Sequence, residues 1–299
     1  MNTPSITIRN LTVRYGRRTA VDAASLTVER GSVYALLGRN GAGKSSLVRC
    51  LLGQQRPEAG SIAVYGDDAW RKRAQLMERI GVVSEEADAP AEMTVAALAA
   101  FSSQLYQRWD AAAVDERLAR FRIAKTAKFG DLSKGQKKQV SLALALASSP
   151  ELLVLDDPTL GLDVVARRSL FEEVIADLAD RGTTIFLTTH DLAGVETIAD
   201  RVGVLLDGKL VLDEELEPLK QRFRRIRFAA QPVALDASPL AATAVRTWGG
   251  GAEAIVSNYD ELAFERYRST SNVPSADVTP MSLEEIFIAV AGEQEGTLS

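Results

Sequence analysis

The chain has 299 residues, of which 46% are apolar and 25% charged, and its formal net charge is −5. This composition is typical of a soluble globular protein, and the length predicts one large domain with an appendage. No domain-sized basic excess occurs, which argues against nucleic acid as the main ligand because phosphate backbones require clustered Lys and Arg. Cys50 is the only cysteine, so an intrachain disulfide and a cysteine metal site are excluded and a reducing, cytoplasmic compartment is favoured.

Membrane-spanning character is not apparent in the sequence. The N-terminus lacks the long apolar core of a secretory signal, and no run of about 20 apolar residues occurs. The longest candidate, 140–147, is far too short. If the protein works at a membrane, we expect another polypeptide to supply the crossing.

The hydrophobic pattern changes along the chain. Alternating apolar and polar residues over 6–13 and 25–29 predict antiparallel strands near the N-terminus. After them, short apolar runs alternate with helical periodicities, which predicts a largely parallel α/β sheet. The predicted buried strands are 33–37, 80–83, 152–155, 184–188 and 202–206. The predicted helices are 44–52, 69–77, 95–108, 136–147 and 165–179.

Two parts of the chain fall outside this alternation. Helical stretches near 95–106 and 111–121 have no strand between them and look like a helical insertion. After about residue 221, short strand-like stretches predict a small β-rich appendage. These stretches are 225–228, 254–256 and 262–264, and a closing helix is predicted from the capping-box spacing of Ser282 and Glu285.

A phosphate-binding loop is the clearest motif. Residues 38–45 fit G-x-x-x-x-G-K-[ST] between a predicted strand and a predicted helix. The glycines let backbone N–H groups turn toward an anion, the helix N-terminus adds a positive dipole, and Lys44 supplies a full charge. Ser45 offers its hydroxyl to Mg²⁺. The candidate nucleotide-binding residues of this segment are Gly38, Arg39, Asn40, Gly41, Ala42, Gly43, Lys44, Ser45 and Ser46.

Four further motifs follow in a fixed order. They are Leu-Ser-Lys-Gly-Gln at 132–136, Leu-Leu-Val-Leu-Asp-Asp-Pro at 152–158, Gly-Leu-Asp at 161–163 and Thr-Thr-His at 188–190. From residue 6 to about 219 the chain resembles the ABC ATPases, in which these motifs are the signature, the Walker B strand, the D-loop and the switch-histidine loop. The resemblance implies an α/β P-loop ABC ATPase cassette over 1–220. It has a mixed sheet core, an antiparallel β subdomain and a helical subdomain at about 86–150, and the appendage occupies 221–299.

The resemblance implies roles for single residues as well. Asp156, at the end of a buried strand, can hold Mg²⁺ near the β and γ phosphates of ATP. Asp157 is expected to orient or deprotonate the attacking water, and His190, the only histidine, to contact the γ-phosphate edge and the same water. Tyr15 stands where the family stacks an aromatic ring on adenine.

The signature carries the main implication for assembly. Ser133 and the Gly135 N–H lie at a predicted helix start, with Gln136 beside them, and in the family this anion site faces the ATP held by another subunit. Because the chain has one P-loop and one signature, the resemblance implies a dimer with itself or with a related chain. ATP would join the pair and hydrolysis would release it.

Two positions depart from the family pattern. Asp157 follows the Walker B aspartate where the family usually has Glu, and one methylene less retracts the carboxylate by about 1.5 Å. Glu85 lies where the family usually has Gln, and Glu86 is the neighbouring alternative. Glu85 is either a tolerated variant that still binds Mg²⁺ or a second carboxylate that compensates for the short Asp157.

These features predict an ATP-binding and ATP-hydrolysing subunit of an ABC transporter that drives a separate polytopic permease. We expect it to be cytoplasmic and peripheral on the inner face of the cell membrane. The closing segment 283–288 resembles the end of drug- and antibiotic-exporter subunits and favours export. The alternative is a soluble ABC ATPase with a regulatory or sensory role. The helical insertion is consistent both with a permease contact and with an ordinary helix core.

Overall fold

The computed structural model describes residues 3–86, 88–229, 240, 242–270 and 275–296. The chain divides into two units, Met1–Asp213 and Glu214–Ser299. The second unit begins earlier than the boundary at residue 221 expected from the sequence. Glu214 accounts for the difference, because its carboxylate accepts a hydrogen bond from the Arg222 guanidinium at 2.9 Å. Arg222 in turn donates to Ser257 O, and its carbonyl accepts the N–H of Tyr259 at 2.8 Å, both within the second unit.

The first unit contains the elements that the sequence pattern predicts, with small shifts in their bounds. Its strands are β1 Ile6–Tyr15, β2 Arg18–Val28, β3 Val33–Leu37, β4 Ala59–Val64, β5 Asp67–Asp68, β6 Ile80–Val83, β7 Leu152–Asp156, β8 Thr184–Thr189, β9 Arg201–Leu206 and β10 Lys209–Glu215. Its helices are α1 Lys44–Leu51, α2 Arg73–Met77, α3 Val95–Ser103, α4 Ala111–Arg120, η1 Phe129–Asp131, α5 Lys134–Ala147, α6 Val164–Arg181 and α7 Leu192–Val195. Strand β10 extends two residues past Asp213, the last residue of the first unit.

A six-stranded sheet in the order β10-β9-β3-β8-β7-β6 forms the centre of this unit. Strands β9, β3, β8, β7 and β6 are parallel to one another. Every residue of β3 and of β8 is buried, as expected for a parallel sheet covered on both faces. In the register, Leu155 pairs with Val83 and Asp156 with Thr188, so the segments that follow these strands emerge at the same edge.

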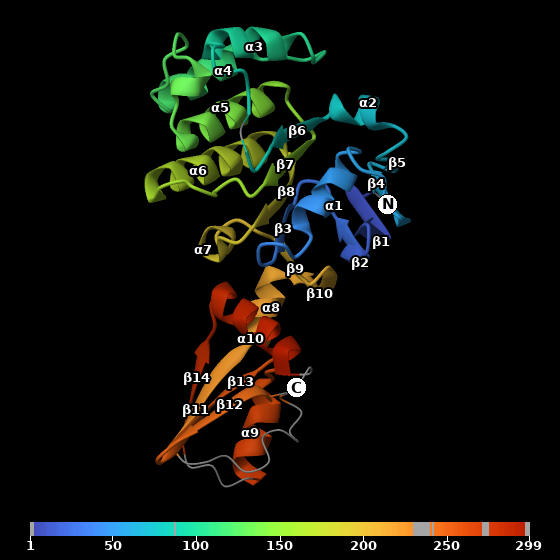
Figure 1. Cartoon of the computed structure of the whole chain (residues 1–299). Helices are drawn as coiled ribbons and strands as arrows, with labels where there is room; N and C mark the ends of the chain where they lie inside the picture. The colour runs from blue at the N-terminus through green and yellow to red at the C-terminus, as the bar shows by residue number, and fades with distance from the viewer. Residues whose placement is uncertain (1–2, 87, 230–239, 241, 271–274, 297–299) are drawn as a thin grey trace. The chain divides into compact units, whose positions relative to one another are not determined.

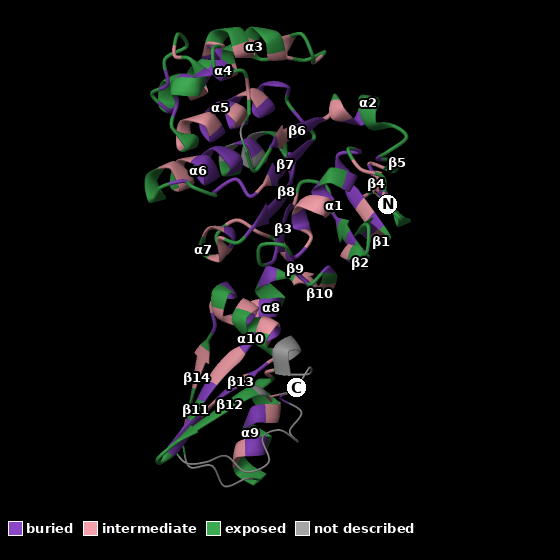
Figure 2. Ribbon diagram, viewed as in Figure 1, coloured by how far each residue is buried: buried purple, intermediate pink, exposed green. Residues whose placement is uncertain are grey.

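An antiparallel sheet in the order β2-β1-β4-β5 lies beside the central sheet in Figure 1. Alternate residues of β1 and β2 point into one hydrophobic core with side chains of α1, and Figure 2 shows this alternation of buried and exposed positions. Ile6, Leu11, Val28 and Leu47 belong to that core and are fully buried. The antiparallel strands expected over 6–13 and 25–29 are therefore confirmed.

The helical insertion runs between β6 and β7. Helices α3, α4 and α5 pack on one another around their own core, in which Val95, Val114, Leu118, Val140 and Ala143 are buried. Helix α3 ends at Ser103, not at residue 108 as predicted. Helix α2 spans only Arg73–Met77, because Ala69 still donates its N–H to Ile62 O in a strand-like contact.

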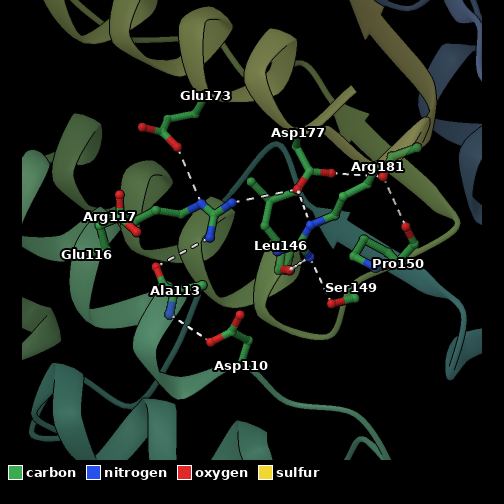
Figure 3. A network of polar contacts seen from close by, with 12 residues as sticks. Asp110, Ala113, Glu116, Arg117, Leu146, Ser149, Pro150, Glu173, Asp177 and Arg181 are labelled. Carbon is green, nitrogen blue, oxygen red and sulfur yellow. Dashed lines mark hydrogen bonds and ion pairs between the residues drawn. The ribbon is translucent and has the colours of Figure 1, made fainter. Parts of the chain in front are cut away.

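A buried ionic network joins the helical insertion to α6 (Figure 3). Asp177 and Glu173 on α6 are almost fully buried, and Arg117 on α4 contacts Glu173 at 3.3 Å and Asp177 at 3.6 Å. Arg181 contacts Asp177 at 3.5 Å and donates to Ser149 Oγ at 2.8 Å. The two helices are thus joined by ionic contacts.

The second unit has helix α8 Leu216–Arg222, strands β11 Arg224–Phe228, β12 Ala242–Trp248, β13 Gly251–Val256 and β14 Ala276–Pro280, and helices α9 Glu261–Thr270 and α10 Leu283–Gly296. Its sheet is antiparallel in the order β12-β13-β11-β14. The appendage is therefore β-rich, as predicted, and the capping box that precedes α10 forms between Ser282 and Glu285.

The strand predicted at 262–264 is wrong, because these residues lie in α9. Asp260 begins this helix: its carboxylate accepts the N–H of Ala263 at 2.8 Å and its carbonyl accepts the N–H of Phe264 at 2.9 Å. Phe264 and Tyr267 are buried at helical spacing, whereas Leu262 is exposed. Across both units, none of the described helices is both long enough and apolar enough to cross a bilayer.

Candidate functional site

The phosphate-binding loop connects β3 to α1. Gly41 and Gly43 adopt positive φ angles of 84° and 111°, and a Cβ added to Gly43 would lie 2.1 Å from Ala20 O. The turn therefore requires glycine at this point, and it brings the loop backbone to the N-terminus of α1. Lys44 is buried and donates to Gly38 O at 2.7 Å. Burial lowers the pKa of Lys44, and the nearby carboxylates of Asp157, Asp156 and Glu85 oppose this shift.

A groove of about 480 Å³ lies over this loop. Most of the residues predicted to bind nucleotide line it, whereas Gly38 and Arg39 lie outside the lining. The lining residues are Tyr15, Arg18, Ala20, Asn40, Gly41, Ala42, Gly43, Lys44, Ser45, Ser46, Arg49, Glu85 and Asp157. Tyr15 is 43% exposed at its rim, which suits a ring that stacks on a base.

Arg18 and Arg49 also line the groove, although neither belongs to a motif recognised in the sequence. Arg18 lies on β2 and donates to Gly41 O at 3.3 Å, which places a guanidinium beside the loop. Arg49 lies on α1, one turn after Ser45. The i, i+4 spacing from Ser45 could have indicated Arg49, whereas Arg18 depends on the pairing of β2 with β1.

Carboxylates collect at one end of the groove. A second hollow of about 430 Å³ is lined by Ser45, Glu85, Glu86 and Asp156, among other residues, so both glutamates considered from the sequence reach it. Asp156 accepts a hydrogen bond from Thr188 Oγ1 at 2.6 Å. Ser45, Asp156 and Glu85 present one hydroxyl and two carboxylates, the hard oxygen donors that suit Mg²⁺.

This donor set is incomplete without a ligand. In the part of the chain that the structure describes, no group of three or more His, Cys, Asp or Glu side chains forms a metal cage. A Mg²⁺ ion usually combines one or two protein carboxylates with phosphate oxygens and water, and few protein donors are then needed. The residues at this end of the groove therefore fit a Mg²⁺ ion that arrives with a nucleotide.

Asp157 and His190 form a pair beside these carboxylates. His190 Nδ1 lies 3.0 and 3.1 Å from the two carboxylate oxygens of Asp157. Asp157 is buried and has a φ of 45°, and its N–H donates to Thr188 O at 3.0 Å and Thr188 Oγ1 at 3.1 Å. His190 is therefore oriented through Asp157, a contact that the sequence did not predict, and its ring is 46% exposed.

The signature residues begin helix α5. Ser133 Oγ accepts the N–H of Gln136 at 3.2 Å, and Gln136 Oε1 accepts the N–H of Ser133 at 3.0 Å, which completes a capping box. Ser133, Gly135 and Gln136 line a pocket of about 830 Å³ together with D-loop residues such as Gly161 and Asp163. This pocket and the groove over the P-loop have no lining residue in common.

A glycine-rich loop that joins a central parallel strand to a helix, with Asp156 ending the strand β7 two places along the sheet, defines a P-loop nucleoside triphosphatase. Comparison with known proteins narrows the class. The model of the ABC transporter family matches residues 21–160. A bacitracin transport ATP-binding protein of Bacillus licheniformis is 33% identical over 72% of this chain and 71% of its own length.

The likeness extends into the second unit for some relatives. A fluoroquinolone export ATP-binding protein of Mycobacterium tuberculosis is 34% identical over 98% of this chain and 95% of its own length. A solved ATP-binding subunit of an ABC transporter superposes with a TM-score of 0.66 at 26% identity, over 73% of this chain and 92% of its own. The chain belongs to the ATP-binding proteins of the ABC transporter family, and it is an ATPase.

Proposed function

We propose that the chain is the ATP-hydrolysing subunit of an exporter, and that two subunits enclose ATP between the P-loop of one and the signature of the other. One observation supports this assembly. The groove over Lys44 and the pocket at Ser133 have no lining residue in common, and each exposes one half of the anion-binding groups that a triphosphate requires. A second chain supplies the missing half.

Within one composite site, each residue has a separate task. The loop N–H groups and Lys44 bind the phosphates, and Tyr15 stacks on the base. Ser45, Asp156 and Glu85 would hold Mg²⁺, which would supply positive charge to balance the β and γ phosphates. Asp157 accepts a proton from the attacking water, and His190 stabilises the orientation of its carboxylate through the 3.0 Å contact.

Export is inferred from the relatives. The bacitracin relative named above is a transport ATP-binding protein, and the fluoroquinolone relative is an export ATP-binding protein. We infer that a separate polytopic permease holds the chain at the inner face of the cell membrane. A regulatory ATPase without a permease is not favoured by these relatives.

The dimer is tested with Ser133→Asp. An aspartate keeps the N-terminal cap of α5, because its carboxylate can accept the N–H of Gln136 as the Ser133 hydroxyl does. It also places a negative charge at the anion site. In the Asp157→Asn background, which slows hydrolysis, we expect ATP to convert the parent chain to a dimer in size-exclusion chromatography with light scattering. Ser133→Asp should bind ATP with unchanged affinity and remain monomeric.

The matched control is Ser133→Thr, which keeps both the cap and a neutral hydroxyl and should dimerise as the parent does. An ATP-dependent dimer of Ser133→Asp with the parent's dissociation constant would contradict the composite site.

A further inference from the structure

One charged side chain close to the carboxylates belongs neither to the nucleotide groove nor to the surface. Lys138 lies on α5, two residues after Gln136, and is only 3% exposed. The neighbouring Lys134 and Lys137 on the same helix are exposed and half-buried. Lys138 is absent from the described residues that line the groove and the hollow around Ser45. A buried ammonium is costly unless it meets acceptors and negative charge.

The ammonium of Lys138 joins two backbone segments. It donates to Ser84 O at 2.6 Å and to Asp157 O at 3.4 Å. Ser84 directly precedes Glu85 and follows the end of β6, whereas Asp157 follows the end of β7. Lys138 therefore connects the loop that carries Glu85 with the peptide of Asp157.

These contacts complete the anchoring of Asp157. Its N–H is held by Thr188, its carbonyl is an acceptor of Lys138, and its φ of 45° lies in the left-handed region, which non-glycine residues enter at a cost. The same carbonyl accepts the N–H of Leu160 at 3.2 Å, so hydrogen bonds on both sides of Asp157 hold this conformation and Lys138 adds the one that comes from α5. The direction of the Asp157 carboxylate toward His190 depends on that conformation.

Charge gives Lys138 a second effect. The carboxylates of Asp157, Asp156, Glu85 and Glu86 all act on its ammonium electrostatically. Burial lowers the pKa of Lys138, and these four carboxylates raise it in opposition. Because Glu85 adds a charge that an amide at the same place would not carry, Lys138 offsets repulsion within this acidic group.

We propose that Lys138 is a positioning residue for hydrolysis: its buried ammonium ties the Glu85 loop to the Asp157 peptide and balances their negative charge. It lines neither the groove over the P-loop nor the hollow around Ser45, and it acts through Asp157 and Glu85. This inference rests on the proposed function, since it assumes that Asp157 and Glu85 work at the hydrolytic centre. It predicts that Lys138 affects the rate of hydrolysis and leaves the binding of ATP largely unchanged.

Steady-state hydrolysis of Mg-ATP by the full-length chain tests the proposal. Lys138→Met removes the charge and the donors while keeping the length of the side chain. We expect kcat to fall by about tenfold to a hundredfold, since misplacement of a catalytic group by around 1 Å costs up to that much, with KM changed less than about twofold. Lys138→Arg should recover a large part of kcat. Lys137→Met, on the same helix, is the matched control and should keep the parental rate.

A double-variant cycle separates positioning from simple support of the fold. If Lys138 offsets the charge of Glu85, the loss of kcat caused by Lys138→Met is smaller in the Glu85→Gln background than in the parent. If thermal unfolding shows that Lys138→Met is not folded, Lys138→Gln replaces it in the cycle, because the glutamine amide keeps a hydrogen-bond donor without the charge. The proposal would be overturned if Lys138→Met lowered kcat equally in both backgrounds and Lys138→Arg lowered kcat as much as the neutral variant does.

Asp157→Asn in the same assay distinguishes a failure of the Lys138 proposal from a failure of the proposed hydrolytic site. An inactive Asp157→Asn together with a fully active Lys138→Met refutes only the role of Lys138. A fully active Asp157→Asn refutes the hydrolytic site on which the inference depends.

Discussion

At the scale of single residues, one of the two departures from the family pattern concerns the length of a side chain in the proposed hydrolytic site. Asp157 is shorter than the usual glutamate by a methylene, yet its carboxylate lies within 3.1 Å of His190 and its peptide is hydrogen-bonded to Thr188 and Lys138. A short side chain on a well-fixed backbone can still hold a defined direction. We therefore retain Asp157 as the proposed general base.

Asp157→Asn tests this role. The amide keeps the size of the side chain but cannot accept a proton, so kcat should fall by about a hundredfold to ten-thousandfold while the dissociation constant of ATP changes little. Rapid-quench measurement of γ-phosphate release gives kcat, and equilibrium binding of a fluorescent ATP analogue gives the dissociation constant. A variant that hydrolyses ATP at the parental rate would assign the base to another group.

The single cysteine gives a prediction on pH. Burial on α1 raises the pKa of the Cys50 thiol to about 11. The reactive thiolate is therefore scarce near pH 8, and the folded protein should react with iodoacetamide far more slowly than the denatured chain does. Mass spectrometry after timed alkylation measures this. As pH rises from about 9 toward 11 the unfolded thiol ionises first, so the contribution of Cys50 to stability decreases.

At the scale of elements, Figure 3 shows charged side chains between α4 and α6 where apolar packing would be the simpler choice. Asp177 accepts from Thr183 Oγ1 at 2.8 Å and faces both Arg117 and Arg181. These ionic contacts link the helical insertion to α6, whereas the apolar core around Val114 and Leu118 lies within the insertion.

Asp177→Asn should lower the free energy of unfolding by about 3 kcal/mol, because it leaves the largely buried Arg117 with less compensating charge. Chemical denaturation followed by circular dichroism measures the change. The matched control is Asp115→Asn on α4, whose pair with Lys125 is half-exposed and should contribute about 1 kcal/mol or less. Equal losses for the two variants would contradict the importance of burial.

Sequence patterns predict some of these elements and miss others. The loop at 38–45 and its strand and helix are local, so spacing and glycine content are sufficient to predict them. The strand expected at 262–264 was wrong because the buried residues Phe264 and Tyr267 follow a helical spacing of three and Asp260 caps a helix at this point. Lys138 resembles part of a solvated run with Lys137, and its burial follows only from the packing of α5 against the sheet. Arg18 reaches Gly41 only through the pairing of β2 with β1.

At the scale of the whole molecule, the proposed composite site for ATP requires a second chain. One chain presents the P-loop groove and the signature pocket without a shared lining residue. Family membership establishes an ATPase, whereas the composite site and the separate permease are our proposals. If two identical chains pair, each dimer contains two composite sites, and each motif of a chain contributes to only one of them.

Mixing two inactive variants tests the composite site most directly. Lys44→Ala removes the phosphate-binding charge, and Ser133→Asp repels the partner's nucleotide, so each variant alone should hydrolyse ATP at less than a hundredth of the parental rate, on the order expected for loss of an essential electrostatic group. In a mixed dimer both defects fall in one site and the other site is intact. We predict that an equimolar mixture recovers at least about a quarter of the parental rate, the value for random pairing, in which half of the dimers are mixed and each has one working site. A mixture as inactive as its components, measured where the parental chain is dimeric, would contradict it.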